Sequence, residues 1–193
     1  MNSVVTKTER VASLPMAASC ALTDLTSMPR VGFRGTASAA YLTALGYVLP
    51  ADPNHATKQR SGEWIARLSA SEFLILGAFE DQGARVAQHE ADWALDERRN
   101  YLLPRQDSHA WLQLTGRKNS EVMAKLCGVD LSPEAFPSGA VAQTSAARIT
   151  VTVINAGSEG DARFFILFDS ASYAYFRHAL VDAMAEFQNS HGR

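Results

Sequence analysis

Cysteine, charge imbalance and long apolar runs are all scarce in this sequence. Its 193 residues include two cysteines, Cys20 and Cys127, which show neither a CxxC spacing nor a histidine at metal-site spacing. No apolar run approaches the roughly 20 residues that a membrane-spanning helix needs. The formal net charge of −2 gives no overall attraction to nucleic acid or to an anionic membrane. These features favour a protein of the reducing cytoplasm without nucleic-acid or membrane partners.

Several motifs that carry well-known chemistry are also missing. The sequence has no GxGxxG dinucleotide fingerprint, no GxxxxGK[ST] phosphate loop, no GxSxG nucleophile elbow and no HExxH zinc motif. The glycines Gly157 and Gly160 have the wrong spacing for dinucleotide binding and lie between two expected strands. We therefore expect none of these four kinds of site.

The residue types that most often form sites are dispersed along the chain. The histidines are His55, His89, His109, His178 and His191. Isolated histidines are more typical of surface or half-buried positions than of metal ligands, and Cys127 at an expected helix end is more typical of a small buried residue. We predict no catalytic, cofactor-binding or metal-binding residue in this chain.

The charged and aromatic residues that stand out are more typical of a solvated surface or a protein interface than of a catalytic site. Asp92 and Asp96 have the i,i+4 spacing of a solvated helix face. Arg30 and Arg34 flank the first expected strand, where they can bind an anion or a carboxylate of a partner protein, and we favour a partner-facing salt bridge over a catalytic role. Tyr175 falls beside the apolar stripe of the last expected helix and can project into an interface.

Residues 1–20 show no sustained period and are expected to form an N-terminal arm. Lys7 and Arg10 precede a short apolar segment that ends at Cys20, which loosely imitates an exported lipoprotein signal. That segment is short and contains Pro15 and two serines, so we favour the arm. Cys20 is accordingly expected in a loose segment without an activating neighbour.

The stretch from His109 to Ala147 organises the sequence as strand, glycine turn, helix, loop and strand. Period-two and helical patterns predict further elements on both sides of it. Expected strands cover 30–35, 63–68, 73–77, 111–114, a start near 141–144, 147–154 and 163–168, and expected helices cover 37–45, 82–95, the region of 122–126 and 169–188. Residues 21–29 are expected as a leading segment, residues 51–62 as a polar loop, and Pro104 and Arg105 as the end of the first half.

The same order of elements occurs twice. Gly116 lies 81 positions after Gly35 (116 − 35), and Leu126 lies 81 positions after Leu45 (126 − 45). Each glycine follows a short strand, where we expect it to permit a positive φ at the turn into the helix. The sequence therefore predicts an α+β fold of two pseudo-repeated βαββα halves, 21–105 and 106–193, packed into one body.

Three segments resemble one known family. They are 24–35 with Leu45, Gly46 and Pro50, then 67–76, and finally 114–116 with 126–131, 136–139 and 143–144. Together they resemble the gamma subunit of heterotetrameric sarcosine oxidase, and the likeness covers about 21–188, nearly the whole chain. That family is similar in fold to the folate-binding region of the glycine-cleavage T-protein.

The resemblance implies a function and a set of partners. Such a chain is a non-catalytic subunit of a complex that oxidatively demethylates sarcosine to glycine and passes the one-carbon unit to tetrahydrofolate. The implied partners are alpha, beta and delta subunits, which are expected to hold FAD, FMN, NAD, tetrahydrofolate and zinc. No cofactor is expected in this chain, and no catalytic residue can be transferred to it.

The sequence alone does not exclude several other functions. The small subunit of N-methylglutamate dehydrogenase has a similar pattern. A stand-alone folate-binding protein of the T-protein type and an α+β interaction module are further alternatives. The Lys-Gly-Cys-Tyr motif of folate-dependent iron–sulfur repair proteins is absent, and the chain is too short for a full T-protein folate site.

Overall fold

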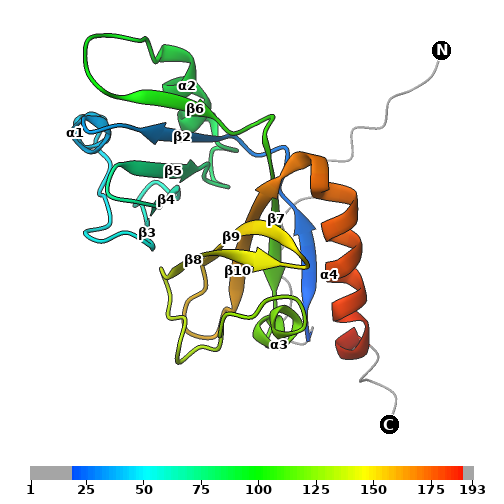
Figure 1. Ribbon diagram of the computed structural model, residues 1–193. Helices are drawn as coiled ribbons and strands as arrows, with labels where there is room; N and C mark the ends of the chain where they lie inside the picture. The colour runs from blue at the N-terminus through cyan, green and yellow to red at the C-terminus, as the bar shows by residue number, and fades with distance from the viewer. Residues whose placement is uncertain (1–18, 189–193) are drawn as a thin grey trace, which may run out of the picture.

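A computed structural model describes residues 19–188, which form two five-stranded antiparallel sheets (Figure 1). The first sheet has the strand order β3-β4-β5-β2-β6 and carries two helices. Its elements are β2 (Arg30–Arg34), α1 (Ser38–Ala44), β3 (His55–Lys58), β4 (Trp64–Arg67), β5 (Glu72–Leu76), α2 (Ala84–Asp92) and β6 (Tyr101–Pro104).

The second sheet has the order β1-β7-β10-β9-β8 and also carries two helices. Its elements are β1 (Ala21–Asp24), β7 (His109–Thr115), α3 (Asn119–Ala124), β8 (Val141–Ala146), β9 (Ile149–Asn155), β10 (Arg163–Asp169), the short 3-10 helix η1 (Ser170–Ser172) and α4 (Tyr173–Gln188). The order strand, helix, three strands, helix runs from β2 to α2 and again from β7 to α4. The predicted α+β fold of two repeated halves is therefore confirmed. The second half contains the extra strand expected near Val141, and the first half contains an extra strand, β3, that was not expected.

The leading strand of each half lies in the sheet of the other half. β1 precedes β2 in the chain but pairs with β7, and β6 precedes β7 but pairs with β2. The predicted first half, 21–105, thus contains one strand of the second sheet and ends with a strand that extends the first. The two linkers, 25–29 and 105–108, pass between the sheets in opposite directions.

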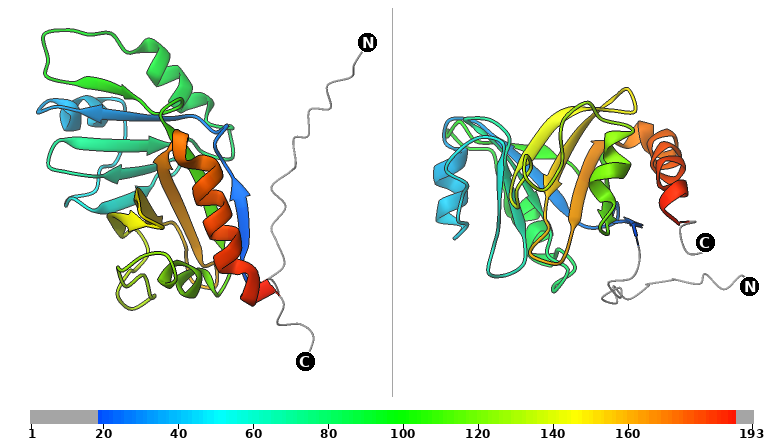
Figure 2. Two further views of the ribbon diagram at one scale, coloured as in Figure 1. Left: turned by 45° about the vertical axis from the view of Figure 1, so that its right-hand side comes forward. Right: turned by 90° about the horizontal axis from the view of Figure 1, so that it is seen from below.

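Each sheet buries both of its faces, because alternate residues along a strand point to opposite sides. In β10, Phe164, Ile166 and Phe168 face α3 and α4, whereas Phe165 and Leu167 face the first sheet. In β5, Phe73 and Ile75 face Leu42 of α1 and Val86 of α2, whereas Leu74 and Leu76 face the second sheet. The result is four layers, helices, sheet, sheet, helices, with α1 and α4 on opposite sides of the strands (right panel of Figure 2).

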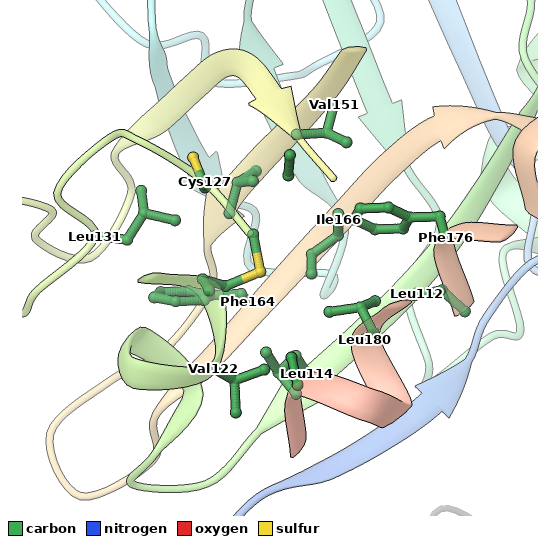
Figure 3. Packing of buried hydrophobic residues seen from close by; sticks show 14 of the residues in the cluster. Leu112, Leu114, Val122, Cys127, Leu131, Val151, Phe164, Ile166, Phe176 and Leu180 are labelled. Atoms are coloured by element: carbon green, nitrogen blue, oxygen red, sulfur yellow. The ribbon is translucent and has the colours of Figure 1, made fainter. Parts of the chain in front are cut away.

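The largest apolar cluster lies between the second sheet and its helices. Figure 3 shows Leu112, Leu114, Phe164 and Ile166 of the sheet with Phe176 and Leu180 of α4 and Val122 of α3. Cys127 also belongs to this cluster and is buried, as the sequence predicts. The predicted stripe of the last helix is confirmed, since Phe176, Leu180 and Met184 are all buried.

Arg30 joins the two linkers at the point where they pass each other. Its Nη1 donates to the carbonyls of Thr26 (2.9 Å) and Met28 (2.7 Å) in the first linker. Its Nη2 donates to the carbonyl of Gln106 in the second linker (2.9 Å) and to that of His109. The side chain is fully buried, and within residues 19–188 no carboxylate lies within ion-pair distance of it. Burial lowers the pKa of Arg30 to about 10, so the guanidinium stays charged at neutral pH.

The expectation that Arg30 binds an anion or a partner carboxylate is therefore wrong. A guanidinium spreads its N–H donors in a planar fork, which here meets carbonyls of two separate segments. Arg34, at the other end of β2, has an exposed side chain whose Nε lies 3.8 Å from Glu72. Its role as a partner contact stays a prediction.

Three strands lie where loops or a leading segment were expected. β3 has a single buried residue, Ala56, so it lacks the alternating pattern of a half-buried strand. β6 lies at a sheet edge, where the terminal Pro104 is tolerated. β1 gains its pairing from β7, about 90 residues away in the chain, for example between Leu22 and Leu114.

Two further expectations need correction. The predicted helix 82–95 spans only Ala84–Asp92, because Trp93 adopts an extended conformation. Its side chain packs against the apolar cluster between the first sheet and its helices. Cys20 was expected in a loose arm, but it is buried in the core of the second sheet. The remainder of the predicted arm, residues 1–18, lies outside the described residues.

Gly35 and Gly116 both have positive φ, as predicted. Each also lies against the segment that leads into a strand at a sheet edge, β6 for Gly35 and β1 for Gly116. A Cβ on Gly35 would be 2.0 Å from the carbonyl oxygen of Arg99, just before β6. A Cβ on Gly116 would be 2.6 Å from the carbonyl oxygen of Ser19, just before β1. The lack of a side chain at these two glycines thus leaves room for the backbone just before β6 and β1.

Replacement of Gly116 should therefore destabilise the protein more than positive φ alone explains. We expect Gly116→Ala to lower the free energy of unfolding by about 3 kcal/mol, because strain and a backbone clash combine. Gly160 has a φ of +77°, and a Cβ added there would meet nothing within 4 Å, so Gly160→Ala is the matched control, expected to cost about 1 kcal/mol. Urea unfolding of both variants measures the difference, and equal losses would contradict the close-approach explanation.

Arg30→Lys should destabilise the protein by about 3 kcal/mol, because one ammonium group cannot serve carbonyls of both linkers. Arg34→Lys at the exposed end of the same strand should change the stability by less than about 0.5 kcal/mol. Thermal or urea unfolding of the two variants makes the comparison. A loss of similar size in both would show that the crossing of the linkers does not depend on Arg30.

Candidate functional site

The histidines and cysteines do not converge on one point in the described chain. His55 and His178 are exposed on β3 and α4, whereas His89 and His109 are half-buried in different halves. His191 lies outside the described residues. Within 19–188, no group of three or more His, Cys, Asp or Glu side chains is placed to hold a metal ion. No helix in this part of the chain is long and apolar enough to cross a membrane.

A buried polar cluster attaches the helices of the first sheet. The carboxylate of Glu63 is 1% exposed, accepts from the Ser61 hydroxyl and lies 3.3 Å from Nη1 of Arg85. The Arg85 guanidinium stacks over the Tyr47 ring at 4.5 Å, and the Tyr47 hydroxyl lies 2.9 Å from Nδ1 of His89. These contacts join α2 to the loop after α1 and to the start of β4, so the cluster has a structural role.

A cleft of about 320 Å³ lies between the two halves. One wall comes from the ends of β3 and β4 and from the segment after β5, and the other comes from β10, the β9–β10 hairpin and the segment before β8. The second wall is held by Asn155, whose Nδ2 donates to the carbonyl of Phe136 and whose Oδ1 accepts from the amide of Gly157. The Ser138 hydroxyl also donates to the carbonyl of Gly157, at 2.5 Å.

Three aromatic rings line this cleft. Phe165 of β10 is almost fully buried, and the rings of Trp64 and Phe79 each approach it at a centroid distance of 6.3 Å. The Trp64 ring is perpendicular to Phe165, and the Phe79 ring is inclined to it by 64°. The aromatic surface of the cleft is therefore built by both sheets.

Four charged side chains line the same cleft, two of each sign. Asp161 and Arg163 form an ion pair at 2.8 Å in the β9–β10 hairpin. Lys58 ends β3, and Glu80 follows β5 with its Oε2 so close to Gly62 that a Cβ there would lie 2.2 Å away. Within the described part of the chain, neither Lys58 nor Glu80 is in an ion pair. Among residues 19–188, the cleft thus offers one cation and one anion that are outside any ion pair.

A second, more open groove of about 580 Å³ runs along α3 and the loop after it. It is lined by Arg117, Asn119, Val129 and Leu131 among others, and the buried Nδ2 of Asn119 has no hydrogen-bond partner in the described structure. Fewer complementary groups meet here than in the cleft, so the cleft is the better candidate site.

Sequence reasoning did not identify the residues of the cleft. They come from five segments between 58 and 165, and none forms a motif with its neighbours in the chain. The segment 155–161 was correctly expected as a hairpin loop, but no pattern connected it with Trp64 or Phe79. Asp92 lies exposed at the end of α2, as expected of a solvated face.

Large apolar side chains are exposed at several places outside the cleft. They are Val48, Leu95, Tyr101, Val129, Tyr175 and Val181. Tyr175 is 54% exposed, and its hydroxyl donates to the carbonyl of Ala147 in the turn between β8 and β9. Its participation in an interface stays a prediction.

Two curated proteins are similar to this chain over most of its length. The sarcosine oxidase subunit gamma of Corynebacterium sp. (strain U-96) is 30% identical over 152 residues, which cover 79% of this chain and 71% of the relative. The protein of the same name from Corynebacterium sp. (strain P-1) is 28% identical over 183 residues, covering 93% and 87%. No family model matches the chain.

Solved structures give the same relationship. A chain of the heterotetrameric sarcosine oxidase from Corynebacterium sp. U-96, in complex with pyrrole 2-carboxylate, superposes with a TM-score of 0.73 and 26% identity, covering 90% of this chain and 88% of that one. The glycine cleavage system aminomethyltransferase T from Bartonella henselae superposes with a TM-score of 0.58 at 14% identity, covering 86% of this chain and 46% of that one. The second match concerns the fold alone and confirms the expected likeness to the T-protein.

The stability of the protein should fall on mild acidification, in part through His89. Burial, together with the nearby Arg85, lowers the pKa of His89 below its ordinary value. The unfolded chain therefore binds the proton more readily, so the stability is complete above a pH of about 6.5 and declines as the pH falls below it. We expect His89→Asn to flatten the decline between about pH 7 and pH 5 in urea unfolding.

His109 should leave a residual slope in that variant, because burial, Arg105 and Arg30 lower its pKa as well. His178→Asn, at an exposed position of α4, is the control and should leave the slope unchanged. An unaltered slope in His89→Asn would refute the assignment.

Proposed function

The chain belongs to the family of sarcosine oxidase gamma subunits, and from this premise we propose that it is the non-catalytic gamma subunit of a heterotetrameric oxidase acting on sarcosine. The observation that carries the proposal is the agreement between its sequence relatives and the structural match to a chain of such a heterotetramer. Homologues of this chain are subunits of an oxidoreductase complex, so other subunits of one complex are its partners.

The proposal specifies the partners and the reaction further. Alpha, beta and delta subunits complete the tetramer, and they hold FAD, FMN, NAD, tetrahydrofolate and zinc. The complex oxidatively demethylates sarcosine to glycine, passes the one-carbon unit to tetrahydrofolate, and is located in the cytoplasm. The role of this chain is assembly, to which its exposed apolar residues such as Leu95 and Tyr101 contribute by contacting partner chains.

Co-expression of this chain with alpha, beta and delta subunits of a sarcosine oxidase from the same source tests the proposal. We expect a tag on this chain to recover the partner subunits in a constant ratio through size-exclusion chromatography. The recovered complex should contain flavin and consume oxygen with sarcosine. Omission of this chain should lower the yield of assembled complex, because the partner surfaces that it covers stay exposed to water.

Substrate comparison separates the alternatives. Oxygen consumption with sarcosine supports a sarcosine oxidase, whereas reduction of an added electron-acceptor dye with N-methylglutamate but not with sarcosine identifies the N-methylglutamate dehydrogenase. Calorimetric titration of the full chain with tetrahydrofolate distinguishes the stand-alone folate-binding protein, for which micromolar binding is expected. A chain that recovers no partner, or that turns over an amine by itself, refutes the proposal.

A further inference from the structure

The groove along α3 lies beside the first residue that the structure describes. The carbonyl of Ser19 accepts from the amide of Lys118, just before α3, at 2.9 Å. Arg117 and Ala162 both line the groove, and the carbonyl of Ala162 accepts from the amide of Gly116, against which Ser19 packs. The start of β1 accordingly lies next to α3 in Figure 1. The residues that precede Ser19 in the chain are therefore attached at the edge of this groove.

Apolar side chains line much of the groove. Val129 is 42% exposed, and Ala124 and Pro133 are exposed as well. Leu131 and Cys127 also line it, and both belong to the apolar cluster between the second sheet and its helices (Figure 3). The groove is thus continuous with a core, and an apolar segment laid in it would extend that core to the surface.

We propose that residues 11–18 of this chain dock in the groove along α3. This segment has no charged side chain, and its two largest apolar residues, Leu14 and Met16, are separated by Pro15. A proline disfavours the helical conformation for the residue before it and favours an extended one. Because side chains two positions apart point to the same side of an extended chain, Leu14 and Met16 enter the groove together.

Length and attachment favour this segment over a separate molecule. α3 has six residues and is therefore about 9 Å long, whereas residues 11–18 span up to about 28 Å when extended. The segment therefore reaches along the helix before the charged residues Glu9 and Arg10 occur. A segment tethered at the edge of its site has an effective concentration in about the millimolar range, so weak contacts suffice for docking.

A buried amide group in the groove also lacks an acceptor. Asn119 lines the groove and is 4% exposed, and its Nδ2 has no hydrogen-bond partner among the described residues. Buried donors are rarely left unpaired in folded proteins. An extended segment in the groove supplies backbone carbonyls as acceptors, and Pro15 has no amide N–H that would need an acceptor in return.

Methyl NMR of the full chain tests this docking. The chain has five methionines, so isotope labelling of the methionine methyls gives few signals. Met16→Leu identifies the signal of Met16 while keeping a side chain of similar size. We expect nuclear Overhauser contacts from the Met16 methyl to the methyls of Val129 and Leu131. Absence of these contacts, with the Met16 signal at the position of an unfolded methionine, overturns the proposal.

Gly128→Leu fills the groove and should displace the segment. Gly128 lines the groove, its φ is outside the left-handed region, and a Cβ added there would meet nothing within 4 Å. We expect the equilibrium constant for docking to fall about tenfold, seen as a loss of the Met16 contacts. The signals of the buried Met123 and Met184 should stay dispersed, because the fold is retained. Ala91→Leu, at an exposed position of α2, is the matched control and should leave the contacts unchanged. Contacts of equal strength in both variants overturn the proposal.

The same spectra distinguish two other occupants of the groove. Contacts to Val129 that appear only as the protein concentration rises identify a second copy of the chain. Contacts that appear only after assembly with the partner subunits identify a segment of a partner. Either result overturns the docking of residues 11–18.

Docking within the chain is independent of the proposed function, because a chain that recovers no partner can still show the Met16 contacts. If the chain needs its partners to stay in solution, the same methyl labels are read in the assembled complex. There, contacts between Met16 and Val129 support the docking, and their absence overturns it.

Discussion

The fold depends on a crossing of two linkers that a single buried guanidinium holds together. Arg30 donates to carbonyls of both linkers and has no carboxylate partner in the described chain. A charged group without an ion pair is costly to bury unless its hydrogen bonds are satisfied. Here the two Nη atoms of Arg30 donate to four carbonyls, while its buried Nε has no hydrogen-bond partner in the described structure. The result is that each half of the chain must complete the other's sheet.

The repeat is close to symmetrical, but its two crossings differ in chemistry. Position 111 lies 81 residues after position 30 (111 − 30), and there the second half has Trp111, which is also fully buried. The backbone amide of Trp111 donates to the Thr26 hydroxyl at 3.2 Å, and its carbonyl accepts from the amide of Leu25 at 2.8 Å. The second half thus holds the first linker through its backbone, while its indole stacks against Phe79. The side chain of Arg30 thus makes polar contacts with the linkers, whereas the side chain of Trp111 makes an apolar contact in the core between the sheets.

The exchange of strands also explains why the cleft lies between the halves. Because both faces of each sheet are buried, the inner faces meet in a shared apolar core of residues such as Leu74, Leu76, Ile154 and Leu167. Beyond this core, glycines and short loops leave a space whose rings and charges come from both sheets. Membership of the gamma-subunit family gives the molecule a place in an oxidoreductase complex. The cleft adds a feature that assembly alone does not require.

The sequence by itself determined the local elements and their repetition. The apolar run in 163–168 and the helical stripe from Phe176 to Met184 are local patterns that indicate a buried strand and a helix. The 81-residue offset of Gly35 and Gly116 indicates the repeat. The family was also readable, because short segments around those glycines resemble known gamma subunits. Only the tertiary structure decided the exchange of β1 and β6, the burial of Arg30 and Cys20, and the cleft. Each of these depends on partners tens of residues away, and neither an edge strand nor a buried arginine has a local pattern that identifies its partner.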